Sequence, residues 1–126
     1  MNVNNERNDL NWLKEEKFIS DNTKIIAFLT EFNNGVMIFL TDKNYRIGTI
    51  AIAVPMKLDN LNQINSSTIP LMFGVRNELI TRAIAEKIAK TTNKLSIAIT
   101  NFASDIKNHY NSLFDVINKL LNRMSH

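Results

Sequence analysis

The side chains that could do chemistry are few and widely separated in this sequence of 126 residues. Histidine occurs twice, at His109 in a helical segment and at His126 at the end of the chain, and cysteine does not occur. Neither histidine stands at metal-ligand spacing from the other or from a cluster of carboxylates. A nucleophile–histidine–acid triad would have to use His109, and the Gly-x-Ser-x-Gly turn of one large hydrolase class is missing. The sequence therefore predicts no catalytic residue, no metal site and no enzymatic activity.

Glycines and paired carboxylates offer no further chemistry. The three glycines, Gly35, Gly48 and Gly74, do not form a G-x-G-x-x-G or G-x-x-x-x-G-K loop, so no phosphate-binding fingerprint is present. We read Gly35 as a turn residue and Gly48 as a position of close packing or a bulge. Glu15 and Glu16 are adjacent carboxylates in a charged stretch, where solvation is the simplest interpretation. No cofactor is expected.

The net charge of +3 and the pI near 9.3 raise the question of nucleic-acid binding. Residues 1–75 hold seven Lys/Arg and eight Asp/Glu, whereas residues 76–126 hold eight and four. The basic excess is scattered over helical segments without a dense run, which favours a solvated face. The strand at 46–52 also lacks the stacking aromatic residues that an RNA-binding sheet uses. We therefore expect no nucleic-acid partner.

The N-terminal residues read as an arm outside the folded body. Residues 1–7 are polar and lack the apolar core of a signal peptide, and no apolar run approaches the ~20 residues of a membrane span. These features predict no membrane partner and a location in the cytoplasm, with the nucleus as a second compartment. We expect residues 1–17 to form a partly disordered arm and residues 18–126 to form one α/β domain. Trp12 lies in the arm and could pack on the core or on a partner.

Periodic apolar residues predict the elements of that domain. Strands are expected at 24–32, 36–41 and 46–54, with a tight turn at 33–35, where Asn and Gly tolerate the positive φ of hairpin turns. Pro55 is expected to close the third strand, since proline cannot donate to a sheet. A long polar loop at 56–67 and a strand at 68–74 would follow.

The second half of the chain predicts a helix at 76–92, a strand at 94–100 and a terminal helix. The helix at 76–92 begins near Asn77, ends near Asn93 and should bury a stripe at helical spacing. That stripe comprises Leu79, Ile80, Ala83, Ile84 and Ile88. The terminal helix follows a cap at Ser104 or Asp105. Its apolar face comprises Ile106, Tyr110, Leu113, Phe114, Ile117, Leu120, Leu121 and Met124.

Taken together, the elements predict an α+β (mixed α/β) single domain with a largely antiparallel sheet of about five to six strands, flanked by two main helices. The strands at 36–41, 47–54 and 95–99 are apolar on both alternating faces, as in sheets that are covered on both sides. Two helices and a short arm do not suffice to cover both faces. A partner subunit would bury the remainder.

The sequence resembles the proteasome assembly chaperone 3 family over residues 18–121. Residues 30–41 (Thr-Glu-Phe-Asn-Asn-Gly-Val-Met-Ile-Phe-Leu-Thr) and 47–50 (Ile-Gly-Thr-Ile) are similar to its first hairpin and following strand. Residues 71–74, 78–80 and 85–88 are similar to its Leu-Leu-Gly, Pro-Leu-Ile and Ala-Lys-x-Leu series. The matches occur in the family's order and spacing, whereas Arg76 and Asn77 stand where the family is usually more acidic.

The resemblance implies a chaperone without cofactor or catalysis. Such chaperones pair with a similar sister chaperone, and the pair helps to order α subunits into the ring of the 20S proteasome. A heterodimer with the sister or a homodimer is therefore expected, together with contact to one α-type subunit. The family's contact surface includes loop residues, and the loop at 56–67 is the closest candidate here, with a plain flexible connection as the alternative. The candidate partner-binding residues are Met56, Lys57, Asp59, Asn60 and Asn62.

Two other functions compete with this interpretation. A small α/β scaffold of the longin or roadblock kind, serving protein trafficking, would have a similar order of elements. Nucleic-acid binding would have to rely on the basic C-terminal half alone.

Overall fold

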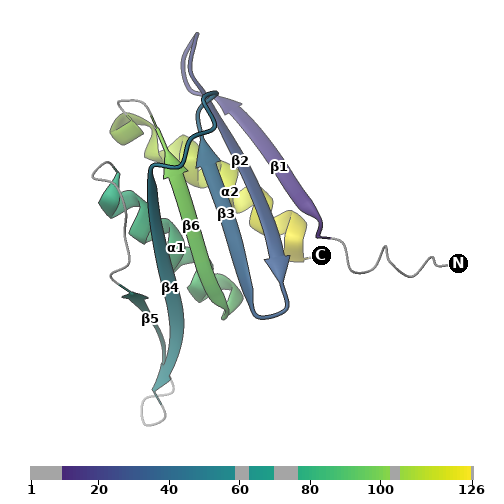
Figure 1. Cartoon of the computed structure of the whole chain (residues 1–126), viewed down its shortest axis with the longest axis vertical. Coiled ribbons are helices and arrows are strands. Elements are labelled where there is room, and N and C mark those ends of the chain that lie inside the picture. Colours follow the sequence, from purple (N-terminus) through teal and green to yellow (C-terminus); the bar gives the residue numbers. More distant parts are fainter. Residues whose placement is uncertain (1–9, 59–62, 70–76, 103–105, 126) are drawn as a thin grey trace, which may run out of the picture.

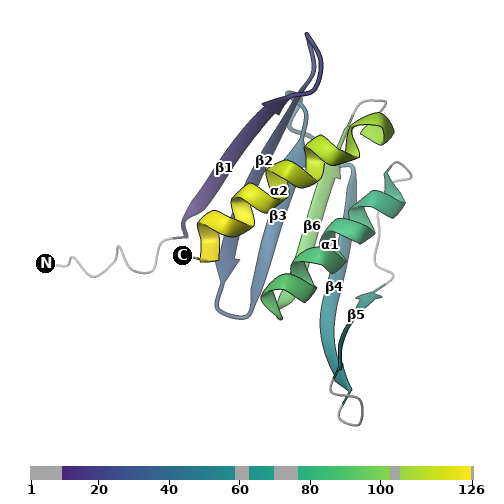
Figure 2. The same cartoon turned by 180° about the vertical axis from the view of Figure 1, so that it is seen from behind.

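Six strands form one sheet in the order β1-β2-β3-β6-β4-β5, with two helices packed on it (Figures 1 and 2). The computed structural model describes residues 10–58, 63–69, 77–102 and 106–125. The β3–β6 pairing is parallel and the other four pairings of the described strands are antiparallel. The predicted α+β domain with a largely antiparallel sheet and two main helices is confirmed. The elements are β1 (Trp12–Phe18), β2 (Lys24–Phe32), β3 (Gly35–Thr41), β4 (Thr49–Leu58), β5 (Gln63–Ile69), α1 (Glu78–Thr92), β6 (Leu95–Asn101), the 3₁₀ turn η2 (Ile106–His109) and α2 (Tyr110–Ser125).

The β2–β3 hairpin is present as predicted, but for a different physical reason. Phe32 pairs with Gly35, so Asn33 and Asn34 form the loop between the strands. None of the three turn residues has a positive φ. Instead, a Cβ atom on Gly35 would stand 3.0 Å from the carbonyl oxygen of Leu95 on the neighbouring β6. Glycine is needed here because two strands approach closely.

The segment predicted as a long loop is a second hairpin. Strand β4 begins at Thr49 and continues through Pro55 to Leu58, and β5 then pairs with it antiparallel. The pairing of β4 with β6 ends at Ala53, so beyond that residue β4 has β5 as its strand partner. Proline is tolerated in a strand that is paired on one side. The loop at 56–67 and the strand at 68–74 were therefore misplaced, and residues 59–62 and 70–76 lie outside the described residues.

Strand β1 was not predicted, because its charged sequence Trp-Leu-Lys-Glu-Glu-Lys-Phe hides the alternation of an edge strand. None of its residues is buried. It pairs with β2 throughout its length, and two ion pairs join it to α2. Lys17 Nζ lies 3.1 Å from Asp115 Oδ2, and Arg123 Nη1 lies 2.8 Å from both Glu15 Oε2 and the Lys14 carbonyl oxygen. The arm assigned to residues 1–17 thus contributes a strand to the sheet from Trp12 onward.

Helix α1 packs on β4 and β6 with Ile80, Ile84 and Ile88 of the predicted stripe buried, but the buried face is centred to one side of that stripe. Its buried residues are Ile80, Thr81, Ile84, Ala85, Ile88 and Ala89, whereas Leu79 is 79% exposed and Ala83 is also exposed. Small side chains on the opposing strands, Ala51, Ala53 and Ala98, are fully buried and allow the helix to approach. A hydrogen bond of 2.8 Å between the buried hydroxyls of Thr81 and Thr100 ties α1 to β6.

The caps of α1 lie where the sequence predicted them. Asn77 and Asn93 both have a left-handed backbone, with φ of 61° and 58°. Asn77 makes no side-chain cap bond; its carbonyl oxygen instead accepts hydrogen bonds from the backbone N–H and the hydroxyl of Thr81. The N–H of Asn93 donates to the carbonyl of Ala89 and closes the last turn.

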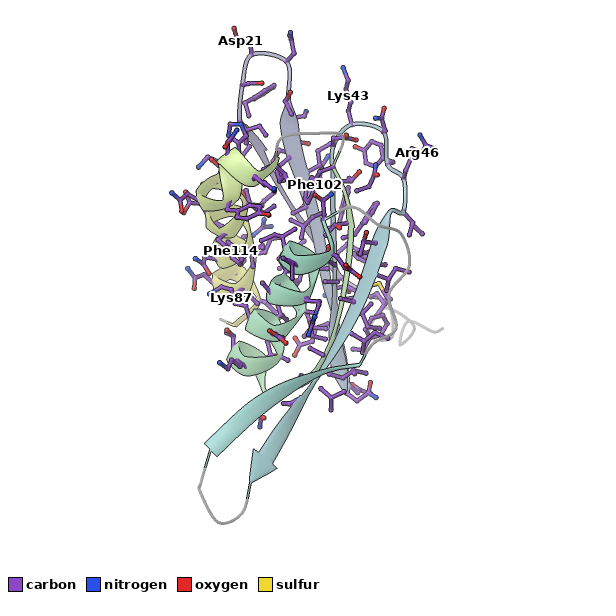
Figure 3. All side chains as sticks on the ribbon, turned by 90° about the vertical axis from the view of Figure 1, so that its left-hand side faces the viewer. Asp21, Lys43, Arg46, Lys87, Phe102 and Phe114 are labelled. Atoms are coloured by element: carbon purple, nitrogen blue, oxygen red, sulfur yellow. The ribbon has the colours of Figure 1, made fainter. Side chains whose placement is uncertain are left out.

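Helix α2 buries the predicted face against β1 and β2. Ile106, Leu113, Ile117, Leu120 and Leu121 are buried, together with Val116, which the predicted face did not include. The larger side chains Tyr110, Phe114 and Met124 are partly buried and pack at the edge of the core. Figure 3 shows the sheet from its edge, with both helices on one side. The predicted cap residues Ser104 and Asp105 lie outside the described residues.

The face that α1 buries can be tested with two neighbouring side chains. Ile84→Ala removes a side chain with no exposed area and should lower the free energy of unfolding by about 2–5 kcal/mol. Leu79→Ala should change it by less than about 0.5 kcal/mol, since the side chain is 79% exposed. Urea titration of both variants measures the difference. Comparable losses in the two variants would mean that α1 buries Leu79 as well, as the sequence predicted.

Candidate functional site

The two helices cover the same face of the sheet and leave the other face uncovered by any described helix (Figures 1 and 2). Alternation along the strands decides which side chains lie there. On β2, for example, Ile25, Ala27 and Leu29 enter the core beneath the helices, so Phe28 lies on the opposite face. We call this opposite side the open face. Its partly exposed apolar side chains on the central strands include Phe28, Met37, Phe39, Ile50, Ile52, Ile97 and Ile99.

A shallow apolar hollow of about 320 Å³ lies on the open face. The rings of Phe28 and Phe39, directly opposite each other on β2 and β3, stack with centroids 6.3 Å apart and planes 18° apart. Trp12, which is 49% exposed, contributes from β1 and does not join the core. The residues that line the hollow are Trp12, Phe28, Met37, Phe39, Ile47 and Ile99. Aromatic and methionine side chains of this kind are enriched at protein–protein contacts.

The β3–β4 connection brings one further side chain, Tyr45, to this face. Asp42 Oδ1 accepts the Asn44 N–H at 2.8 Å and so forms a turn, and Tyr45 follows with φ of 55°. The Tyr45 ring lies 6.3 Å from that of Phe28. Gly48 then fixes the end of the connection, because its N–H donates to the Thr100 carbonyl at 3.0 Å and a Cβ there would stand 2.8 Å from that oxygen. Gly48 is thus a close-packing residue, as predicted.

A row of three charged side chains borders the hollow on the β1 side. Lys14 Nζ and Lys24 Nζ lie 2.9 and 3.0 Å from the two carboxylate oxygens of Glu16. The lysines also lie over aromatic rings, Lys14 over Phe28 at 5.8 Å and Lys24 over Phe18 at 5.4 Å. The hydrogen bond from Lys14, followed by the one from Lys24, holds the pKa of Glu16 below its usual range. The same bond to Glu16 raises the pKa of Lys14. We call Lys14, Glu16 and Lys24 the charged row.

The partner-binding residues predicted from the sequence lie elsewhere. Met56 and Lys57 stand in β4, opposite Asn65 and Ile64 of β5, where β4 has passed the end of its pairing with β6. This part of the hairpin projects beyond the rest of the sheet (Figure 1). Asp59, Asn60 and Asn62 lie outside the described residues. The sequence predicted surplus apolar surface on the strands but did not identify Trp12, Phe28 and Phe39 as its centre.

The other hollows show no catalytic arrangement among the described residues. A more polar hollow of about 390 Å³ lies where the β1–β2 turn, the β3–β4 connection and η2 meet, and it contains both Asp42 and His109. The Asp42 carboxylate is engaged by the Asn44 N–H. Within the described ranges, no three His, Asp or Glu side chains gather closely enough to hold a metal ion. In the same part of the chain, no helix has the length and apolar character required to cross a membrane.

The charged row predicts a specific response to acid. Because the pKa of Glu16 is lowered in the folded chain, its ion pairs contribute stability above the ordinary carboxyl pKa of 4.5, and this contribution is lost as the pH falls through the lowered value. Glu16→Gln should therefore be slightly less stable than wild type near pH 7. The two proteins should become equal in strong acid, as measured by thermal unfolding across the pH range. A difference that persists at low pH would contradict this account.

Comparison with known proteins gives a match at the level of the fold. No family model matches the chain, and no curated protein is significantly similar to it in sequence. Among solved structures, the fold is similar to a chain of the crystal structure described as a novel chaperone complex for yeast 20S proteasome assembly. The TM-score is 0.60 with 13% sequence identity, and the match covers 90% of this chain and 94% of that chain. At this identity the likeness establishes a shared fold.

Proposed function

We propose that this protein is a proteasome assembly chaperone. It pairs with a similar small chaperone, and the pair binds an α subunit to promote ordered assembly of the α ring of the 20S proteasome. The observation that carries the proposal is the likeness, over 90% of the chain, to a component of a yeast 20S proteasome assembly chaperone complex. The short sequence matches to the proteasome assembly chaperone 3 family, in the same order along the chain, support the same conclusion.

The open face supplies the surface for pairing. A stable pair buries about 800 Å² on each partner, with apolar residues at the centre and polar residues at the rim. The open face has this arrangement in its described part: the apolar hollow lies on β2, β3 and β6, and the charged row lies beside it on β1 and β2. A second sheet laid on this face would give β3, β6 and β4 the two-sided cover that their apolar sequences indicate.

The β4–β5 hairpin is the proposed contact with the α subunit. It projects from the body of the sheet (Figure 3), so a subunit could reach it while the open face is occupied by the sister chaperone. Met56, Lys57, Asp59, Asn60 and Asn62 remain the residues that we propose for this contact. The protein works by binding, without catalysis or cofactor, in the cytoplasm and with the nucleus as a second compartment.

Affinity purification of the tagged full chain from native lysate, with mass spectrometry, tests this function. We expect α-type proteasome subunits and a second small chaperone, with mature catalytic subunits scarce. Recovery of GTPases or coat subunits in their place would overturn the proposal in favour of a trafficking scaffold. A chain that elutes alone, as a monomer, would also contradict it.

Two matched variants test whether the open face is the pairing surface. Ile47→Lys places a charge on a hollow residue that is 67% exposed, so folding should be preserved while recovery of the second chaperone falls by about tenfold. Leu79→Lys makes the same change at a 79% exposed residue on α1 and should leave recovery unchanged. Thermal unfolding verifies that both variants fold. Equal recovery with the two variants would place the pairing surface away from the open face.

A further inference from the structure

The charged row occupies a position from which it would influence any partner on the open face. In the β1–β2 register, Lys14 stands opposite Phe28, Glu16 opposite Ile26, and Phe18 opposite Lys24. Lys14 therefore lies beside the hollow, with its ammonium 5.8 Å from the centre of the Phe28 ring. A sheet that covers Phe28 and Phe39 reaches this row as well. The row is thus part of the rim of the pairing surface.

The charges of the row do not balance. One carboxylate, on Glu16, serves two ammonium groups at 2.9 and 3.0 Å, which leaves one positive charge in excess. Contact between Lys14 and Glu16 raises the pKa of Lys14 and lowers that of Glu16, which favours the charged form of both groups. Arg46, which is exposed, lies on the side of the sheet away from the helices and adds to the positive charge (Figure 3).

Apart from Asp21, which lies at the tip of the β1–β2 turn (Figure 3), no other carboxylate on the described part of the open face can offset this excess. Glu15 alternates with Glu16 along β1 and points to the helix side, where Arg123 binds it. Glu31 shares the helix side of β2 with the core residue Leu29 and pairs with Lys94. Asp42 contributes to the polar hollow beside Ile106 and His109. The described open face is apolar at its centre and positive at its β1 edge.

We propose that the open face selects a non-identical chain whose sheet places an acidic side chain against the charged row, and that the row opposes pairing with a second copy. This inference rests on the pairing role proposed above. A second copy would bring the same excess of positive charge and, from the described part of its open face, no carboxylate except Asp21 at the tip of the β1–β2 turn and a Glu16 already shared by two lysines. Like charges at an interface weaken association, and an ammonium group buried without a partner is unfavourable. An acidic side chain would complete the row with a second charge-assisted contact.

The experiment exchanges the charges of the row without removing its ion pairs. A swapped-row variant carries Lys14→Glu, Glu16→Lys and Lys24→Glu, so that each ion pair can re-form while the excess charge changes sign. A control variant carries Lys119→Glu alone, on the exposed face of α2, which gives the same change of two charge units in the net charge. Sedimentation of the purified full chains, alone and in equimolar mixtures, measures association at low and high salt.

The equimolar mixture of wild type and swapped-row variant should associate at least about fivefold more tightly than either protein alone, an effect that corresponds to roughly 1 kcal/mol. Added salt should reduce this gain, and it should strengthen self-association of the wild type, because it screens opposite and like charges alike. A mixture of wild type with the control variant should associate no better than wild type alone.

Three results would overturn the inference. They are a wild-type homodimer whose affinity is insensitive to salt, a mixture no tighter than its components, and an equal gain in the mixture with the control variant. The measurement uses purified chains, so its outcome is separate from that of the affinity purification. A chain that recovers no proteasome subunit but shows the expected charge dependence would lose its proposed function while keeping this pairing preference.

Discussion

Strand β6 lies between β3 and β4, parallel to the first and antiparallel to the second, and the rest of the molecule depends on this placement. Because β6 is central, its backbone is paired on both sides along most of its length. Helix α1 leads into it and α2 follows from it, and both pack on the same side of the sheet. The side chains of β6 that face the helices are small, Ser96, Ala98 and Thr100, so α1 can pack close to the sheet. The consequence is one fully built core and one face without a described covering layer.

The two faces of the sheet therefore have different roles. On the helix side, buried aliphatic residues of the strands and both helices form a continuous core, with no exposed area at Leu29, Ile38, Leu113 or Ile117. This core accounts for the stability of the isolated chain. On the open face the central strands also carry apolar side chains, but all of these except Ile26 remain partly exposed, with aromatic rings at the centre. A monomer gains nothing from such a surface, whereas a protein that pairs with another sheet requires it.

The edges of the sheet are controlled by charge and by shape. β1 is an outer strand without a buried residue. It is held by its pairing to β2 and by two ion pairs with α2, one between Lys17 and Asp115 and one between Glu15 and Arg123. The Arg123 guanidinium also donates a hydrogen bond to the Lys14 carbonyl oxygen, so this acceptor on β1 is not available to another strand. At the other edge, β4 and β5 leave the sheet as a projecting hairpin. The open face thus lies between an outer strand held by charged contacts and a hairpin that leaves the sheet.

The sequence by itself determined the elements whose information is local. The periodicity of α2, the β2–β3 hairpin, the positions of Asn77 and Asn93 and the short strand β6 follow from residues close together in the chain. The surplus of apolar strand surface could also be predicted, because alternation reveals both faces of a strand. The sequence alone did not reveal β1, whose pairing depends on β2. Nor did it reveal that β4 continues through Pro55, which is tolerated because the pairing of β4 with β6 has ended before that residue. Tertiary structure alone decided that both helices take the same face, that α1 turns Leu79 outward, and that Trp12, Phe28 and Phe39 meet. These features depend on which strands become neighbours, and that choice is made by packing between segments far apart in the sequence.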